Sequence, residues 1–257
     1  MDLNLITCNI RFDNPADGEN AWPHRLSFLS KTILKHGPSI LATQEGRIHQ
    51  LRELKDSLST YQIIDPHRSW IAERMYPTFF IQNSQFEFLG SGDLWLSETP
   101  EIAGSLSFES SFPRLMTWTH LQIKNSFEKL FVVNVHLDHI KDETRIKQTQ
   151  VMLDQIDRYW DKLSHLIIMG DFNDAPHGSV RKLINQNLPF LIDPWKNFNE
   201  KEETSHHGFK GKEENGARID WILVPNKLQV EKLIMDKSHQ SGKYPSDHFP
   251  IICQIKL

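Results

Sequence analysis

The sequence predicts one α/β domain in which two mixed, mostly antiparallel sheets are covered by helices. Three observations support this class: hairpin-like strand pairs, helices interleaved between strands, and the lack of a strict strand–helix–strand alternation. The chain has 257 residues, which is enough for a single large domain with a sizeable core. Neither an internal repeat nor a low-complexity linker interrupts it, so we expect one domain over residues 1–257.

The first half of the chain combines short apolar runs with helical periodicity. Residues 3–10 and 39–45 are apolar and rich in β-branched side chains, which is typical of buried strands. Between them, apolar residues at helical spacing predict a helix over 24–36 that ends at a Gly-Pro pair. A second helix is expected over 48–58. Short strands are then expected in four segments: 61–64, 78–81, 86–90 and 94–98.

The second half begins with two segments of period-two alternation, 115–123 and 129–137, which predict a β-hairpin. The clearest helix covers 142–163, because its apolar residues share one face and the opposite face is charged. Residues 197–216 are polar and predict a long loop, and loops of that length in compact domains tend to be functional. The remaining elements expected are a strand at 165–173, a helix at 179–186, and strands at 217–224, 230–236 and 249–257.

Composition and charge narrow the class of function. Hydrophobic residues make up 39% of the chain and charged residues 24%, which is ordinary for a soluble globular protein. The formal net charge is −4, so the chain lacks the basic excess usual in proteins that coat duplex DNA. A mild acidic excess instead suits a site that holds a hard cation with carboxylates.

Cysteine usage and hydropathy indicate the compartment. Cys8 and Cys253 lie in apolar runs, so we expect two buried thiols and not a disulfide scaffold. The stretch MDLNLITCNIRFD has neither the basic start nor the apolar length of a signal peptide, and no segment reaches the length of a membrane span. We therefore expect a cytoplasmic protein without a membrane span, and the sequence indicates no obligate protein partner.

Polar side chains interrupt the apolar runs at several predicted strand ends. A single Asp after a strand is usually a turn residue or a helix cap. Here six predicted strands are interrupted, and the interrupting residues form a chemically consistent set of side chains. Turns and caps alone do not readily explain this. Carboxylates, imidazoles and amides together suit Mg²⁺ or Mn²⁺ and the activation of water. The residues are Asn9, Glu45, His136, Asp171, Asn173, Asp220, Asp247 and His248.

Six short motifs occur in order along the chain: CNIR, ATQE, NVHLDH, GDFN, RIDWI and SDHFP. Together they resemble the endonuclease/exonuclease/phosphatase superfamily, the metal-dependent phosphoesterases related to deoxyribonuclease I, over nearly the whole chain. The NVHLDH, FPRLMTW and GKYPSDHFP segments resemble more closely a branch of mainly uncharacterised microbial members. The resemblance implies a four-layer α/β/β/α sandwich with the site at one end of the paired sheets.

The resemblance also implies the ligands of a metal ion. Glu45 resembles the principal Mg²⁺ ligand, and Asn9 lies beside it in the motif order. Asp247 resembles a second acidic contact to the metal region. The expected cofactor is therefore Mg²⁺, with Mn²⁺ as a possible replacement.

The same resemblance implies the catalytic roles. His248 resembles the catalytic histidine, held in its tautomer by Asp220, and His136 resembles a second histidine that contacts the phosphate. Asp171 and Asn173 resemble the pair that positions the attacking water and the phosphoryl oxygens. Phosphoester hydrolysis builds negative charge on oxygen, which a cation, an imidazolium and an amide can stabilise. Either Asp171 or His248 could act as the base, and the sequence does not choose between them.

Three further residues are candidate substrate contacts. Arg11 is explained equally well as a phosphate contact and as a surface arginine. Arg114 interrupts an apolar stretch, which favours a buried or substrate-facing role. His207 matches a family position near the site, although a loop histidine is more often exposed to solvent.

The segment AERMYPTFF departs from the pattern of the family branch. Relatives carry a glutamate shortly before this strand, where it would orient the second histidine. Alignment on Pro77 places Arg74 at that position, with Glu73 one residue earlier, and a shift of one residue on a strand reverses the facing of a side chain. Either a local bulge restores Glu73, or His136 is held by a different group.

These observations predict a divalent-metal-dependent hydrolase that cleaves a phosphodiester or a phosphomonoester by direct attack of an activated water. A nuclease that acts on single-stranded or terminal nucleic acid is the alternative. A zinc hydrolase is disfavoured because the histidines are scattered, and a non-catalytic module because the site residues are all present. The substrate expected is a small-molecule phosphoester or a nucleic-acid end, because loops select the ligand on a shared scaffold.

Overall fold

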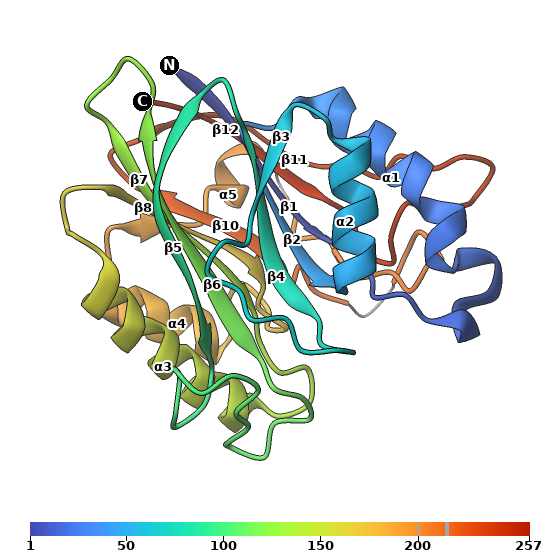
Figure 1. The fold of residues 1–257 in the computed structure, drawn as a ribbon, viewed down its shortest axis with the longest axis horizontal. Coiled ribbons are helices and arrows are strands. Elements are labelled where there is room, and N and C mark those ends of the chain that lie inside the picture. Colours follow the sequence, from blue (N-terminus) through green and yellow to red (C-terminus); the bar gives the residue numbers. More distant parts are fainter. Residues whose placement is uncertain (200, 214–215) are drawn as a thin grey trace.

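The computed structural model describes residues 1–199, 201–213 and 216–257. Its strands form two six-stranded mixed sheets (Figure 1). The first sheet contains, in order across it, β11 (Gln229–Met235), β12 (Ile251–Lys256), β1 (Asp2–Asn9), β2 (Ile40–Gly46), β4 (Tyr76–Gln82) and β3 (Tyr61–Ile64). The second contains β5 (Phe86–Trp95), β6 (Leu115–Ile123), β7 (Lys129–His136), β8 (His165–Asp171), β10 (Asp220–Pro225) and β9 (Leu191–Ile192).

Helices cover the outer face of each sheet. α1 (Trp22–His36) and α2 (Ile48–Ser57) pack on the first sheet, and α3 (Asp142–Tyr159) and α4 (Ser179–Asn187) pack on the second (Figure 1). A short 3₁₀ helix, η1 (Pro15–Asn20), and a single turn, α5 (Trp195–Phe198), complete the described elements. The arrangement is the four-layer α/β/β/α sandwich, so the predicted fold class is confirmed.

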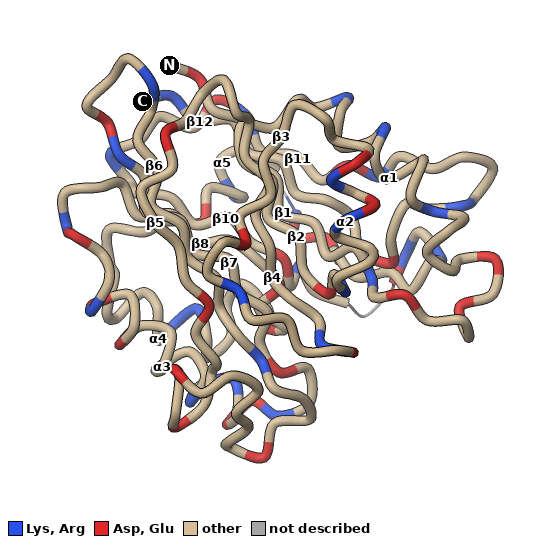
Figure 2. The backbone as a smooth tube through the Cα atoms, viewed as in Figure 1, with Lys and Arg blue, Asp and Glu red and all other residues tan. Residues whose placement is uncertain are grey.

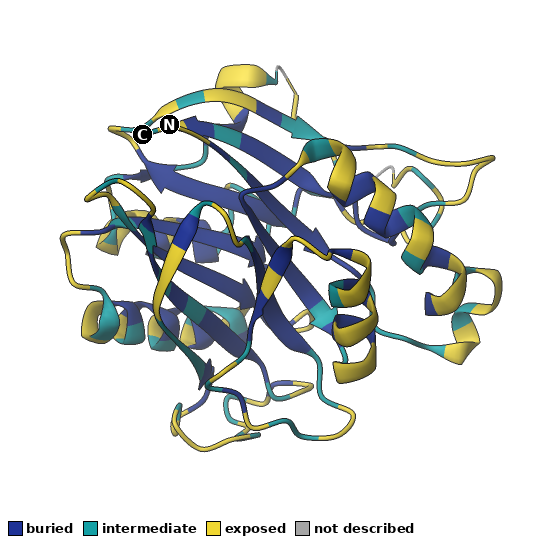
Figure 3. Ribbon diagram, turned by 45° about the horizontal axis from the view of Figure 1, so that its top comes forward, coloured by how far each residue is buried: buried dark blue, intermediate teal, exposed yellow. Residues whose placement is uncertain are grey.

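The central strands of both sheets are buried on two faces, as Figure 3 shows by their dark colour, whereas the edge strands β5 and β11 are partly exposed. Along β1, Leu3 and Leu5 point into the layer between the sheets, whereas Ile6 and Cys8 pack under α1 and α2. This alternation follows from the two-residue period of a strand. Cys8 and Cys253 are both free and buried, and burial raises the pKa of each thiol, so neither is poised to react.

A polar bridge between Gln44 and Asn134 crosses the apolar layer between the sheets. The Nε2 group of Gln44 on β2 donates a hydrogen bond of 2.7 Å to Oδ1 of Asn134 on β7. The Nδ2 group of Asn134 in turn donates to the backbone oxygen of Thr43 at 2.9 Å. Buried amides must be satisfied by partners in a fixed geometry, so this bridge sets the position of one sheet against the other.

Several boundaries differ from the sequence-based predictions. Residues 86–95 form one strand and not two. A bulge between Phe88 and Gly90 shifts the register, and pairing with β6 continues on both sides of it. Gly92 leaves room for the ring of Trp118. α3 ends at Tyr159 and not at residue 163. The carboxylate of Asp161 accepts hydrogen bonds from the backbone after that point, which competes with continued helix.

The predicted loop over 197–216 is mostly irregular where it is described. Its first two residues belong to α5, and residues 200, 214 and 215 lie outside the described residues. No helix in the described ranges has the length and apolarity that crossing a membrane requires.

Candidate active site

The polar residues singled out in the sequence converge on one end of the sandwich. β1 and β2 are parallel, as are β7 and β8, so the carboxyl ends of each pair meet at one edge. This pairing places Asn9 beside the residue before Glu45, and His136 directly opposite Asp171. β10 is antiparallel to β8 and starts with Asp220 opposite Asp171, so it delivers a further carboxylate to the same place.

A cavity of about 280 Å³ opens at this end of the molecule. Phe12, Met75, Phe112 and Ile219 provide apolar parts of its wall. Asn9, Asp220 and His207 are not part of its surface. The predicted site residues that do line it are Arg11, Glu45, Arg114, His136, Asp171, Asn173, Asp247 and His248.

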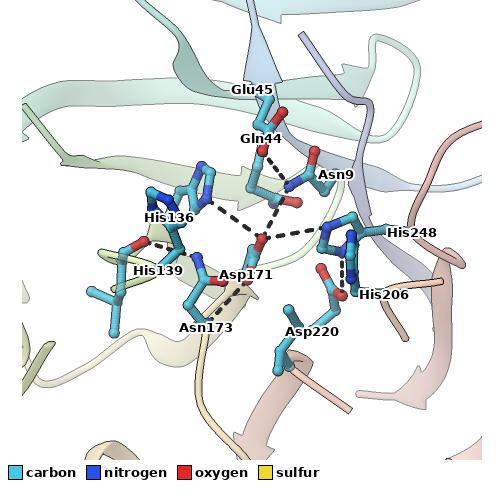
Figure 4. A network of polar contacts seen from close by, with 12 residues as sticks. Asn9, Gln44, Glu45, His136, His139, Asp171, Asn173, His206, Asp220 and His248 are labelled. Carbon is cyan, nitrogen blue, oxygen red and sulfur yellow. Dashed lines mark hydrogen bonds and ion pairs between the residues drawn. The ribbon is translucent and has the colours of Figure 1, made fainter. Parts of the chain in front are cut away.

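Asn9 connects two carboxylates at the centre of the site (Figure 4). Its Nδ2 group donates to Glu45 Oε1 at 3.1 Å and to Asp171 Oδ2 at 3.0 Å. Because only the amide nitrogen can donate, these contacts fix the orientation of the Asn9 side chain. The second oxygen of Glu45 accepts a hydrogen bond of 3.0 Å from the backbone N–H of Phe12.

His248 is paired with a carboxylate. Its Nδ1 atom lies 2.8 Å from Oδ2 of Asp220, and its Nε2 atom lies 3.9 Å from Oδ2 of Asp171. Burial acts to lower the pKa of His248, but the carboxylate of Asp220 outweighs it and raises that pKa to about 10. His248 therefore carries a proton at neutral pH, with its Nε2–H directed toward the centre of the site.

His136 faces the same carboxylate from the other side (Figure 4). Its Nε2 atom lies 3.5 Å from Oδ2 of Asp171, and Nη1 of Arg114 lies 3.0 Å from its ring nitrogens. Burial, together with the positive charge of Arg114, holds the pKa of His136 well below its usual range. His136 is therefore neutral and has an arginine where the resemblance implied an acid.

Glu73 does not reach this site. Its side chain is 80% exposed and forms an ion pair of 3.2 Å with Arg47. No bulge restores it toward the histidine, so the second of the two alternatives drawn from the sequence describes the structure: Arg114 holds His136.

Asp171 lies between the two histidines and is fully buried. Burial raises the pKa of its carboxyl above the ordinary range, and the nearby charge of Asp220 adds to this shift. Its Oδ1 atom accepts the backbone N–H of Asn173 at 3.0 Å. The preceding residue, Gly170, has φ +145, and a Cβ there would lie 2.1 Å from the backbone oxygen of Val135. Glycine thus permits the close strand approach that carries Asp171 into the site.

Three lining residues adopt left-handed backbone conformations that are uncommon outside glycine. Arg11 has φ 55, Glu45 has φ 66 and Asn173 has φ 49. Such residues store backbone strain that the surrounding fold must stabilise, and they cluster at functional sites.

Asp247 is a buried residue that lines the cavity. Its Oδ2 atom is 3.8 Å from Nε of Arg11 and 3.9 Å from Nε2 of His206. Arg11 is also bound at two points, both at 3.0 Å, by the carboxylate of Asp17. The charge of Arg11 is therefore already compensated before a substrate arrives.

Two adjacent histidines of the 197–216 segment behave differently. His206 lines the cavity and its ring centre lies 4.8 Å from that of His248. His207 is buried, its ring stacks on Phe249 at 3.9 Å, and its Nδ1 atom accepts the backbone N–H of Gly211. The sequence pointed to His207, whereas the histidine exposed to the cavity is His206. His139, which the sequence left open as a supporting residue or the polar end of a strand, is a second histidine that lines the cavity, and its Nδ1 accepts from Arg114 at 3.1 Å.

The residues fit a divalent cation. Glu45, Asp171 and Asp247 gather at one cavity, and Oδ1 of the buried Asp220 has no hydrogen-bond partner. Asp171, Asp220 and His248 place ligand atoms within 4.8 Å of one another. Crowded carboxylates repel one another unless a cation lies between them, and oxygen donors with imidazole suit Mg²⁺ or Mn²⁺.

A sequence profile described as the Endonuclease/Exonuclease/phosphatase family matches residues 6–248. The chain belongs to this family. The endonuclease/exonuclease/phosphatase structure from Bacteroides vulgatus is 25% identical, with a TM-score of 0.91 over 100% of this chain and 99% of that one. A mannosyl-6-phosphatase of Bacteroides thetaiotaomicron is 24% identical, with a TM-score of 0.87 over 99% of this chain and 100% of that one.

One further relative is a much longer protein than this chain. The Ccr4 3'-5'-exoribonuclease subunit of the CCR4-Not complex from Candida albicans is 21% identical over 92% of this chain. The match covers 38% of that protein. Members of the family thus include both phosphatases and nucleases, and the family as a whole acts on phosphoesters.

Proposed function

We propose that this protein is a divalent-metal-dependent phosphoester hydrolase in which an activated water attacks phosphorus directly. One observation carries the proposal: in a single cavity, Oδ2 of the central carboxylate Asp171 lies 3.5 Å from Nε2 of His136 and 3.9 Å from Nε2 of His248. The names of two relatives, a mannosyl-6-phosphatase and an exoribonuclease, agree with this reaction class.

Glu45 and Asp247 are the residues that would hold the cation, with Asn9 keeping the Glu45 carboxylate in place through its amide. When bound, Mg²⁺ or Mn²⁺ supplies positive charge that offsets the charge developing on the phosphoryl oxygens. The protein supplies orientation and proton transfer.

Asp171 is the base in this proposal. His248 carries a proton and cannot accept another, whereas the Asp171 carboxyl has a pKa raised toward neutrality, which suits a general base. The water loses a proton to Asp171 as its oxygen forms the bond to phosphorus. His248, oriented by Asp220, gives its Nε2 proton to the leaving oxygen as the ester bond breaks.

The remaining polar groups would bind the phosphoryl oxygens. His136 is neutral and offers one ring N–H, and Asn173 keeps one amide hydrogen free after donating to the backbone oxygen of Leu137 at 3.0 Å. Arg114 adds a guanidinium from the same wall. Arg11 is already paired with Asp17, so its contribution would be smaller.

The substrate we propose is a small phosphoester or the end of a nucleic acid. A volume of about 280 Å³ accommodates a phosphoryl group and little more than one attached unit. Figure 2 shows basic and acidic residues interspersed along the chain, and the formal net charge is −4, which does not favour an extended duplex. A nuclease acting on strand ends therefore stays the second candidate.

The test is hydrolysis of p-nitrophenyl phosphate and bis-p-nitrophenyl phosphate after removal of metal with EDTA. Added Mg²⁺ or Mn²⁺ should restore turnover, and Glu45→Ala should lose roughly 10³-fold or more in kcat/KM. Glu87→Ala, at an exposed position on β5, is the matched control and should retain activity. Restoration by Zn²⁺ alone, or no metal-dependent turnover of any phosphoester, would refute the proposal.

A further inference from the structure

Arg114 has an unusual set of partners for a buried arginine. Its relative exposure is 6%, and its guanidinium hydrogen-bonds to imidazoles: Nη1 lies 3.0 Å from the ring nitrogens of His136 and Nη2 donates to Nδ1 of His139 at 3.1 Å. Its Cζ atom also lies 5.9 Å from the centre of the Phe112 ring. Its Nε–H group is buried and has no partner. No carboxylate in the described ranges forms an ion pair with it.

Three other buried arginines in the described ranges are compensated in different ways. Arg68 binds both carboxylate oxygens of Asp93, and Arg218 pairs with two acids. Arg25 donates to four backbone oxygens. Arg114 lies on an electroneutral pair of rings and still faces the cavity. The carboxylates of Glu45, Asp171 and Asp138 act on it only from beyond ion-pair distance. A buried charge without a direct ion pair is costly, so the fold keeps this guanidinium ready for an anion.

The shape of the anion follows from the planar guanidinium, which binds oxygens of phosphate from a fixed set of N–H donors. A phosphodiester has two non-bridging oxygens and one negative charge. A phosphomonoester has three terminal oxygens and carries between one and a half and about two negative charges at neutral pH. Glu45, Asp247 and His248 lie on one wall of the cavity and would act on the phosphoryl oxygens nearest to them. Arg114 lies on the opposite wall and is suited to bind an additional terminal oxygen.

We propose that Arg114, supported by His136 and His139, makes this cavity selective for a terminal phosphomonoester dianion over an internal phosphodiester. The proposal rests on the proposed hydrolase function. Water forms a new P–O bond, the ester P–O bond breaks, and the products are an alcohol and inorganic phosphate. The proton lost by water goes to Asp171, and the alcohol receives one from His248.

The wall around Arg114 agrees with a terminal group. The ring of Phe112 lies nearly parallel to that of His139, at 17° and 6.0 Å between ring centres, and Phe112 is itself part of the cavity surface. A second ester substituent on this side would have to replace the oxygen that Arg114 binds and would meet these two rings. A monoester presents only oxygen to this wall.

The experiment compares p-nitrophenyl phosphate with methyl p-nitrophenyl phosphate, which share a leaving group and differ in charge. We expect Arg114→Met to lower the ratio of kcat/KM for the monoester to that for the diester by roughly 10²-fold. Arg181→Met is the matched control, because Arg181 is also buried without an ion pair but donates to the backbone of Leu191 outside the cavity. Its ratio should not change. An unchanged ratio in Arg114→Met overturns the proposal.

A second measurement uses the unmodified protein, so it does not depend on the folding of a variant. With Mg²⁺ present at pH 8, inorganic phosphate should inhibit at a concentration at least roughly tenfold lower than dimethyl phosphate does. Equal inhibition by phosphate and dimethyl phosphate overturns the monoester selectivity. If turnover still depends on metal in that case, the proposed hydrolase function stands. Absence of metal-dependent turnover with either ester overturns the hydrolase function and this inference with it.

Discussion

His248 and His136 occupy equivalent places on the two walls of the cavity, and the difference between them is instructive. Each side chain is 6% exposed, and each has its Nε2 atom within 4 Å of the same oxygen of Asp171. His248 has Asp220 as its partner, whereas His136 has Arg114. The pKa of the first is raised and the pKa of the second is lowered.

The comparison shows that burial alone does not decide the charge of a histidine. Burial lowers the pKa of both rings, and the neighbouring charge reverses the effect at one of them. One wall therefore holds a proton that can be given away, and the other holds a neutral donor backed by a permanent cation. Asymmetric pairs of this kind allow proton transfer and anion binding to occur in one small space.

The largest effect should come from the carboxylate that both histidines face. Asp171→Asn removes the proposed base and leaves an acceptor for only one of two donors, the Asn9 amide and the Asn173 backbone N–H. We expect kcat to fall by roughly 10³- to 10⁴-fold, with a smaller change in KM. Steady-state kinetics with Mg²⁺ measure this. Retention of more than a tenth of the activity would mean that Asp171 is not the base.

Replacing each histidine with glutamine separates the two walls. Glutamine is a neutral donor, so it mimics His136 but cannot supply the charge or the proton of His248. We expect His248→Gln to lose roughly 10²- to 10³-fold in kcat, and His136→Gln to stay within roughly tenfold of the parent. Equal losses in the two variants, measured on one substrate, would contradict the division between the walls.

Asp220→Asn sharpens the comparison by changing the partner and keeping the ring. The pKa of His248 is raised from 6.5 to about 10 in the folded protein, so its stabilising contribution is fully present below pH 6.5 and is lost as pH rises through about 10. Without the carboxylate this pKa falls. We expect the alkaline limb of the kcat profile to move to lower pH by at least about one unit, with a loss of roughly 10- to 100-fold at pH 8. NMR titration of the His248 ring provides an independent reading, and an unmoved limb would show that Asp220 does not set the proton affinity.

His207 supplies a reference in which burial dominates. Burial lowers its pKa to about 4, below the ordinary 6.5 of an unfolded chain. The stability that comes from its neutral form is present above pH 6.5 and is lost as pH falls through about 4. His207→Phe keeps the stacking on Phe249 and removes the titration, so we expect its free energy of unfolding to fall less steeply between pH 6.5 and 4, by on the order of 1 kcal/mol. Urea unfolding at several pH values measures this, and parallel pH profiles would contradict it.

Much of this arrangement was predictable because strand ends carry a recognisable chemical signal. The runs that end in Glu45, His136 and Asp171 are apolar and short, so they read as buried strands, and the polar residue that ends each one must face something. The fold class followed from the same runs and is confirmed. The family motifs then brought residues far apart in sequence into one hypothesis.

Other features depend on backbone geometry that the sequence does not encode locally. His206 and His207 are neighbours with identical side chains, and only the loop path decides that the first lines the cavity. The substitution of an arginine partner for an acid at His136 depends on Arg114, which lies 40 residues from Arg74 in the chain. Glu45 likewise has a left-handed backbone conformation that glutamate rarely adopts by itself, so the surrounding fold must impose it.

The amide bridge between Gln44 and Asn134 has a consequence for engineering. Gln44 immediately precedes Glu45, and Asn134 lies two residues before His136, so the bridge ties the two halves of the chemistry to one another. Substitutions of one aliphatic residue for another at the opposite end of the interior, around Leu3 and Ile123, can change the core packing without displacing the reacting groups. We expect the same exchanges beside Asn134 to disturb this bridge and to lower activity more than stability.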